Sequence, residues 1–191
     1  MHVLDRSKLP LNFPTHCHSA EFWVALGRAV ATFGFLEEVL GKEIFAFPGM
    51  REIPDDAVEA ELERWFEKLE RALSDPLGAL INAYEKAVKE NSDPTKLNID
   101  TLLTDLREAA TRRKVICHGS WRMPDEAGAS KPFFVSNMMK IWDTPIDIAH
   151  LNQHQRFTVG LICGVVDSVS FMGWSFPGSN GPGQQVFRRD A

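Results

Sequence analysis

Apolar side chains recur every three or four residues along most of this chain, a spacing that places them on one face of a helix. The longest such stretch runs from Ala20 to about Phe45, and its apolar positions are Phe22, Leu26, Val30, Phe33, Leu36, Leu40 and Ile44. Side chains of a strand instead alternate between two faces, so this spacing does not suit a sheet. The pattern predicts an all-α protein with a long first helix.

Four later segments repeat the pattern, at residues 58–73, 77–88, 99–118 and 144–171. The last opens with Thr144-Pro145, a capping residue followed by a residue that suits the first helical position. In the first of the four, the apolar face consists of Val58, Leu62, Trp65, Phe66, Leu69 and Leu73. Together the segments predict an antiparallel bundle of about five helices.

The first helical stretch contains Gly27, Gly34 and Gly41, which are seven residues apart. A glycine inside a helix costs about 1 kcal/mol relative to alanine. Three glycines on one stripe therefore indicate that another backbone packs closely there, either from the same chain or from a second copy.

A chain of 191 residues has the length of one domain. Residues 1–18 contain two prolines and no sustained period, which predicts an extended arm before a helical domain at 19–176. Within that domain, turn-forming residues separate short aromatic stretches at about 120–143, so we expect a small β-hairpin insertion. Residues 177–191 are rich in glycine, proline, serine and glutamine, which predicts a flexible C-terminal tail.

The formal net charge of −5 argues against a protein that coats itself in nucleic acid, because nonspecific affinity comes mainly from cations that contact phosphates. Any contact with RNA should be a local basic patch. Three widely spaced cysteines and the lack of a secretion-signal pattern predict a cytoplasmic protein. The apolar run 157–174 is interrupted by Gly160, Gly164 and Asp167, and it is too polar to cross a membrane.

Two groups of histidines invite a metal interpretation. His16-Cys17-His18 has zinc-type ligands, but three adjacent side chains do not wrap one ion easily, so we favour a polar arm that leads to Ser19 as a helix cap. His150 and His154 have the spacing of helical zinc pairs, yet the glutamate of the H-E-x-x-H motif is missing. We therefore expect exposed histidines there, and no metal or cofactor.

Arg113 interrupts the apolar stripe of the 99–118 segment, between Ala109 and Ile116. Because a guanidinium does not lose its proton, an arginine on an inward face needs an anion, hydrogen-bond acceptors or an opening to water. One alternative is an internal ion pair with Glu37 or Glu38 of the first helix. The other is a cleft in which Arg113 meets an anionic ligand.

His118 follows five residues after Arg113, and Gly119 suits a left-handed residue that ends the helix. At about 100° per residue, side chains five positions apart point roughly 140° away from each other. One regular helix therefore does not bring the two side chains together. A frayed last turn or a second copy of the chain would be needed.

The stretch from Arg113 to His118, followed by Gly119 and Trp121, resembles the R-x4–6-H motif of the HEPN superfamily of small helical proteins. The resemblance is to uncharacterised bacterial HEPN-like proteins in which Gly and Trp follow the motif histidine. The family usually has Asn, Asp or His after the arginine, and Lys114 departs from that pattern. This departure bears on activity more than on fold.

The resemblance, which spans about residues 19–174, implies a metal-independent endoribonuclease that acts as a homodimer, as in toxin–antitoxin or anti-phage systems. Arg113 and His118 would be the catalytic pair, Arg112 and Lys114 would contact RNA, and an antitoxin or other operon partner would be expected. The alternative is a noncatalytic HEPN-like dimer that binds a protein, a nucleotide or RNA. Lys114 and the acidic net charge favour that alternative.

Overall fold

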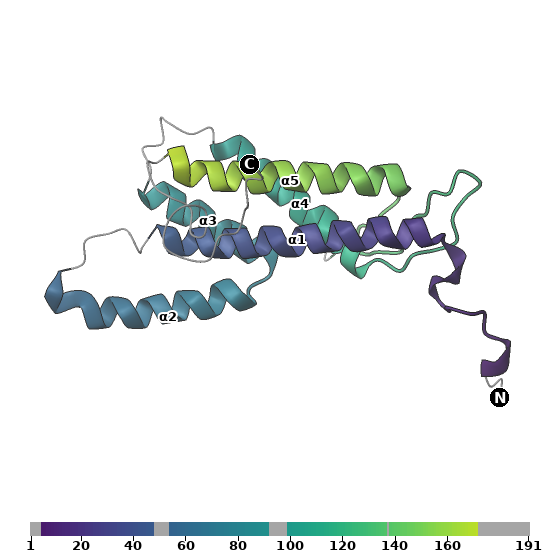
Figure 1. The fold of residues 1–191 in the computed structure, drawn as a ribbon, viewed down its shortest axis with the longest axis horizontal. Helices are drawn as coiled ribbons and strands as arrows, with labels where there is room; N and C mark the ends of the chain where they lie inside the picture. The colour runs from purple at the N-terminus through teal and green to yellow at the C-terminus, as the bar shows by residue number, and fades with distance from the viewer. Residues whose placement is uncertain (1–4, 48–53, 92–98, 137, 172–191) are drawn as a thin grey trace, which may run out of the picture. The chain divides into compact units, whose positions relative to one another are not determined.

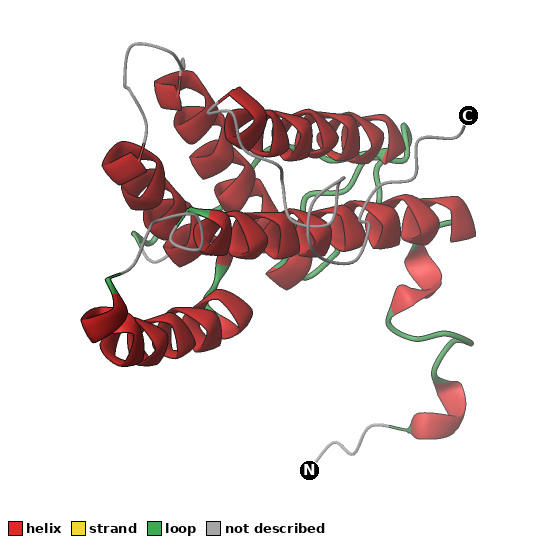
Figure 2. Cartoon of the chain, turned by 60° about the vertical axis from the view of Figure 1, so that its left-hand side comes forward, coloured by secondary structure: helices red, strands yellow, loops and turns green. Residues whose placement is uncertain are grey.

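The computed structural model describes residues 5–47, 54–91, 99–136 and 138–171. These residues form five α-helices (Figure 1), namely α1 (Ala20–Ala46), α2 (Val58–Ser74), α3 (Leu77–Asn91), α4 (Ile99–His118) and α5 (Ile148–Phe171). Short 3-10 turns occur at Arg6–Lys8, Thr15–Cys17 and Asp55–Ala57. Figure 2 draws no strand in this part of the chain. The all-α prediction is confirmed, and the antiparallel bundle stays a prediction.

Local signals explain most of the helix boundaries. α1 begins after Ser19, whose Oγ accepts a hydrogen bond of 3.3 Å from the backbone N–H of Phe22, as expected of a helix cap. Asp75-Pro76 separates α2 from α3, because proline has no N–H to continue a helix. α4 has the bounds that its sequence predicts. None of the described helices has the length and apolar character that a membrane span requires.

The predicted start of α5 at Thr144-Pro145 is wrong. The helix begins at Ile148, and the Oδ1 atom of Asp147 caps it by accepting a hydrogen bond of 2.7 Å from the backbone N–H of His150. Ile146 is buried and exchanges two backbone hydrogen bonds with Ser130, of 2.8 and 2.9 Å. This pairing with a distant residue overrides the local capping signal.

The predicted β-hairpin insertion at 120–143 is also wrong. Between α4 and α5 the described chain forms isolated antiparallel bridges and no strand, and the bridged pairs are Ser120 with Phe133, Ser130 with Ile146, and Val135 with Ile141. Phe133, Val135 and Ile141 are all exposed. Strand register is specified where one face of a sheet is buried, and here the apolar residues bury no such face.

The chain divides into two compact units, and α1, α4 and α5 each contribute to both. Unit 1 comprises Met1–Ala31 and Arg113–Gln155, and unit 2 comprises Thr32–Arg112 and Arg156–Ala191. Unit 1 contains a cluster of aromatic rings around the buried Phe22. Unit 2 contains a buried polar contact among Glu43 of α1, Tyr84 of α3 and Ser168 of α5.

The three described side chains on the apolar face of α2 are not buried as the pattern suggests. Val58, Leu62 and Phe66 are 47%, 51% and 56% exposed. The other three residues of that face have side chains outside the described part of the structure. The helical period thus predicted the helix correctly but not the burial of these three side chains.

The structure corrects the expectation for the arm, and it bears on one of the two alternatives for the glycine stripe. The described part of the arm is not extended, because it contains two 3-10 turns and is held by a hydrogen bond of 2.8 Å from Trp23 Nε1 to the carbonyl oxygen of Thr15. At Gly27 and Gly34, no described atom beyond the helix's own neighbouring backbone lies within 4 Å of where a Cβ would be, so no described segment of this chain packs closely there. The predicted tail at 177–191 lies outside the described residues.

Candidate functional site

Arg113 and His118 lie in the last two turns of α4. Arg113 is half-buried, as its place beside the apolar stripe predicts, whereas His118 is exposed and is the last residue of the helix. The neighbouring Val115 and Ile116 are buried, and they fix the orientation of this end of the helix in unit 1. The two sequence-predicted catalytic residues are therefore held on a rigid element.

Gly119 has a different role from the one its sequence suggests. Among the described glycines, only Gly128 adopts a positive φ, so the prediction of a left-handed Gly119 is wrong. A Cβ on Gly119 would lie 2.5 Å from the carbonyl oxygen of Val115 and 2.7 Å from Cβ of Pro132. Gly119 is required because Pro132 passes close to the end of α4, where no side chain fits.

The end of α4 is a regular helical turn. The backbone N–H of Gly119 donates a hydrogen bond of 2.8 Å to the carbonyl oxygen of Val115, which continues the i to i−4 pattern beyond His118. Arg113 and His118 therefore keep the angular separation of about 140° that regular helix geometry gives. A frayed last turn does not bring the two side chains together.

The two predicted RNA-contacting residues differ in their surroundings. Arg112 forms an ion pair with Glu108 one turn earlier, and its guanidinium lies 5.4 Å from the centre of the Phe157 ring. Lys114 is exposed. Lys114 is thus the more accessible of the two cations, whereas Arg112 is already engaged within unit 2.

The two predicted ion-pair partners of Arg113 lie in the part of α1 that belongs to unit 2. Glu38 is exposed and forms a salt bridge of 2.6 Å with Lys42, four residues later. Glu37 is half-buried. An ion pair between Arg113 and either carboxylate stays a prediction.

His18 is a structural residue of unit 1 that sequence reasoning missed. Its ring stacks on Phe22 with a centroid distance of 4.1 Å and meets Trp121 edge-on at 6.4 Å. Its Nε2 atom lies 2.9 Å from the carbonyl oxygen of Arg122, so Nε2–H is the donor. Because Trp121 and Arg122 are about a hundred residues away along the chain, no local pattern could have identified these two partners.

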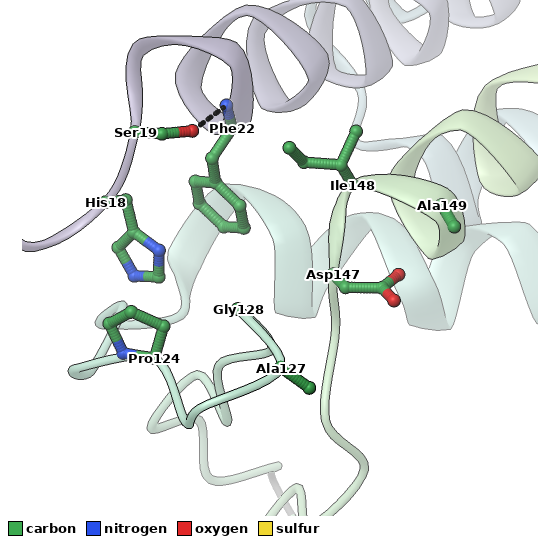
Figure 3. A pocket seen from close by; sticks show the side chains of 9 residues that line it. All are labelled: His18, Ser19, Phe22, Pro124, Ala127, Gly128, Asp147, Ile148 and Ala149. Carbon is green, nitrogen blue, oxygen red and sulfur yellow. Dashed lines mark hydrogen bonds between the residues drawn. The ribbon is translucent and has the colours of Figure 1, made fainter.

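A pocket of about 340 Å³ lies beside His18 (Figure 3). Three stretches of chain line it: His18, Ser19 and Phe22, then Pro124, Ala127 and Gly128, and finally Asp147, Ile148 and Ala149. Its polar side chains already have partners, because Ser19 caps α1, Asp147 caps α5 and His18 bonds the Arg122 carbonyl. Neither Arg113 nor His118 lines this pocket.

The carboxylate of Asp147 illustrates how these polar groups are engaged. In Figure 3 it points away from His18. Its Oδ1 atom accepts from both the backbone N–H and the ring Nδ1 of His150, each at 2.7 Å. Mainly through the backbone hydrogen bond, this contact lowers the pKa of Asp147.

The two histidines of α5, His150 and His154, differ in their surroundings. His150 is exposed as predicted and pairs with Asp147, but His154 is only 9% exposed, so the prediction that it is exposed is wrong. His154 lies one turn after the buried Leu151, on the inward face of α5. In the part of the chain that the structure describes, no three His, Cys, Asp or Glu side chains gather in a way that could hold a metal ion.

The charges are divided unevenly along the chain. Unit 1 has eight Lys and Arg residues and six Asp and Glu residues, hence a net charge of +2. Because the whole chain carries −5, unit 2 carries −7. The basic residues of unit 1 are Arg6, Lys8, Arg28, Arg113, Lys114, Arg122, Lys131 and Lys140. The unit that contains the Arg113 to His118 stretch is therefore the one that would attract a polyanion.

Comparisons of the chain with protein families, with curated proteins and with solved structures found no match.

Proposed function

We propose that this protein is a HEPN-like, metal-independent endoribonuclease that acts as a homodimer, with Arg113 and His118 as its catalytic pair. One observation carries the proposal: a half-buried guanidinium and an exposed imidazole lie in the last two turns of one unbroken helix, within the basic unit. A fixed cation and a proton-transfer group are what cleavage of an RNA phosphodiester requires.

In this proposal, His118 accepts the proton of a ribose 2′-hydroxyl as that oxygen attacks the adjacent phosphorus. The bond between the 2′-oxygen and phosphorus forms, and the bond between phosphorus and the 5′-oxygen breaks. The departing 5′-oxygen takes a proton from water, and His118 then releases the proton that it accepted to solvent. The products are a 2′,3′-cyclic phosphate and a free 5′-hydroxyl. Arg113 stabilises the negative charge that grows on the phosphoryl oxygens, since a guanidinium matches two of them at once.

In this proposal, a second copy of the chain brings together the two side chains that one helix keeps apart. Because α4 is regular to its end, a cleavage site would combine Arg113 of one copy with His118 of the other. One exposed stripe of α1 suits close contact between two helices, because it presents small apolar residues, namely Val24, Gly27, Ala31 and Gly34. The described part of the chain leaves Gly27 and Gly34 open, as a contact with a second copy would require.

The test is incubation of labelled single-stranded RNA with the wild type, His118→Ala and Arg113→Ala in the presence of a metal chelator. We expect the wild type to leave products with a 2′,3′-cyclic phosphate and both variants to lose cleavage while keeping helical circular dichroism. Lys86→Ala, an exposed cation of α3 in unit 2, is the matched control and should cleave like the wild type. Equal cleavage by all four proteins would contradict the proposal.

The second candidate is a noncatalytic HEPN-like dimer that binds RNA, a nucleotide or a partner protein such as an antitoxin. Two observations favour it: Lys114 stands where the family has a polar residue, and Arg112 is already paired with Glu108. RNA retained in a gel shift without any cleavage by the wild type would select this candidate. In that case Lys114→Ala should weaken binding, because it removes an exposed cation.

A further inference from the structure

A buried carboxyl group in unit 2 is independent of the proposed RNA site. Glu43 of α1 has no exposed surface, and its Oε1 atom lies 2.5 Å from Oγ of Ser168 in α5. The hydroxyl of Tyr84 in α3, which is also fully buried, donates a hydrogen bond of 3.0 Å to the same Oγ. Ser168 Oγ is also 2.6 Å from the carbonyl oxygen of Val165.

The number of hydrogens in this cluster decides the protonation state of Glu43. Three short contacts meet at Ser168 Oγ, and each needs one hydrogen. Tyr84 supplies the first from its own hydroxyl. The single hydroxyl hydrogen of Ser168 serves the Val165 carbonyl, which cannot donate. The contact with Glu43 then has a hydrogen only if the carboxyl group carries it.

The surroundings of Glu43 favour the same state. The Oε2 atom has no hydrogen-bond partner among the described residues, which costs far less for a neutral acid than for a carboxylate. Among the described residues, the hydrogen-bonded cluster at the carboxyl contains Ser168 and, through Ser168, Tyr84, and neither is a cation. The nearest basic residue along α1, Lys42, is paired with Glu38. Burial raises the pKa of Glu43 well above its usual range, and burial also raises the pKa of Tyr84.

We propose that Glu43 is a neutral carboxylic acid that donates its proton to Ser168, and that loss of this proton is a pH-dependent switch that loosens unit 2. Ionised Glu43 would place a charge in the core with no cation opposite it among the described residues, and it would leave the Ser168 contact without a hydrogen. The folded protein therefore keeps a proton on Glu43 that the unfolded chain releases.

The direction of the pH dependence follows from this difference. An unburied glutamate ionises near pH 4.5, whereas folded Glu43 keeps its proton above that pH. In this window the folded state binds one more proton than the unfolded state, so the unfolding constant rises tenfold per pH unit. The rise ends at the pH where Glu43 ionises in the folded protein.

The test compares urea unfolding of the wild type and Glu43→Gln at pH 5, 6, 7 and 9. An amide cannot ionise and can still donate to Ser168, so the ratio of the wild-type unfolding constant to that of the variant should rise about tenfold from pH 5 to pH 6 and further above. Glu38→Gln, an exposed glutamate of the same helix, is the matched control and should give a ratio without that rise. A constant ratio for Glu43→Gln would overturn the proposal.

Infrared spectroscopy gives a second readout that does not depend on how well the variant folds. At pH 7 the wild type should show the carbonyl stretch of a protonated carboxylic acid, and Glu43→Gln should lack it. Absence of that band in the folded wild type would overturn the proposal as well.

Discussion

Replacement of Phe22 with alanine should lower the free energy of unfolding by about 3–5 kcal/mol, the range for a large aromatic side chain lost from a core. Phe22 is 2% exposed, and its ring contacts those of His18, Trp23 and Trp121 at centroid distances of 4.1, 5.4 and 5.1 Å. The ring thus joins the arm, α1 and the segment after α4 within unit 1. Urea unfolding followed by circular dichroism measures the loss.

Phe13→Ala is the control for Phe22→Ala, because Phe13 lies in the same unit and is 55% exposed. It should change the unfolding free energy by less than about 1 kcal/mol, as surface substitutions usually do. Equal losses for the two variants would show that the aromatic cluster does not hold unit 1 together.

Replacement of Gly119 with alanine should cost about 1–3 kcal/mol, the usual penalty when an extra methyl group is forced into a packed site. The new Cβ would lie 2.5 Å from the Val115 carbonyl oxygen and 2.7 Å from Cβ of Pro132, and a backbone oxygen and a proline ring have little freedom to move. The thermal midpoint should fall by roughly 2–4 °C for each kcal/mol. The displaced segment would also disturb the end of α4 beside His118.

Gly160→Ala is the matched control for the Gly119 variant. Gly160 lies inside α5, and a Cβ there would have no neighbour within 4 Å. Because alanine stabilises a helix by about 1 kcal/mol relative to glycine, this variant should be slightly more stable than the wild type. If Gly119→Ala also gained stability, the close approach of Pro132 to α4 would be refuted.

Helices could be predicted from this sequence because their signals are local. The apolar period and the Ser19 cap located α1, and the period that ends at His118 located α4. The start of α5 could not be found in this way, because Ile146 pairs with Ser130, sixteen residues away. The hairpin prediction failed because it was based on local β-forming residues. The local sequence does not show that the side chains of these residues are exposed in the fold.

The candidate site shows the same limit. Arg113 and His118 could be selected from one short stretch, and the structure places both on α4 as expected. The roles of His18 and Glu43 could not be foreseen, because their partners Arg122 and Ser168 lie 104 and 125 residues away. The sequence offered Glu37 and Glu38 of α1 as ion-pair partners of Arg113, whereas the fully buried acid among the described residues is Glu43, one turn after Val39 and Leu40.

The central claim is that a complete cleavage site needs Arg113 from one copy of the chain and His118 from another. Mixing two inactive variants, Arg113→Ala and His118→Ala, after joint unfolding and refolding tests it most directly. Mixed dimers would contain one site with both residues intact, so the account predicts that cleavage of labelled RNA returns to a substantial fraction of the wild-type rate. A mixture as inactive as each variant alone, beside an active wild type, would contradict it.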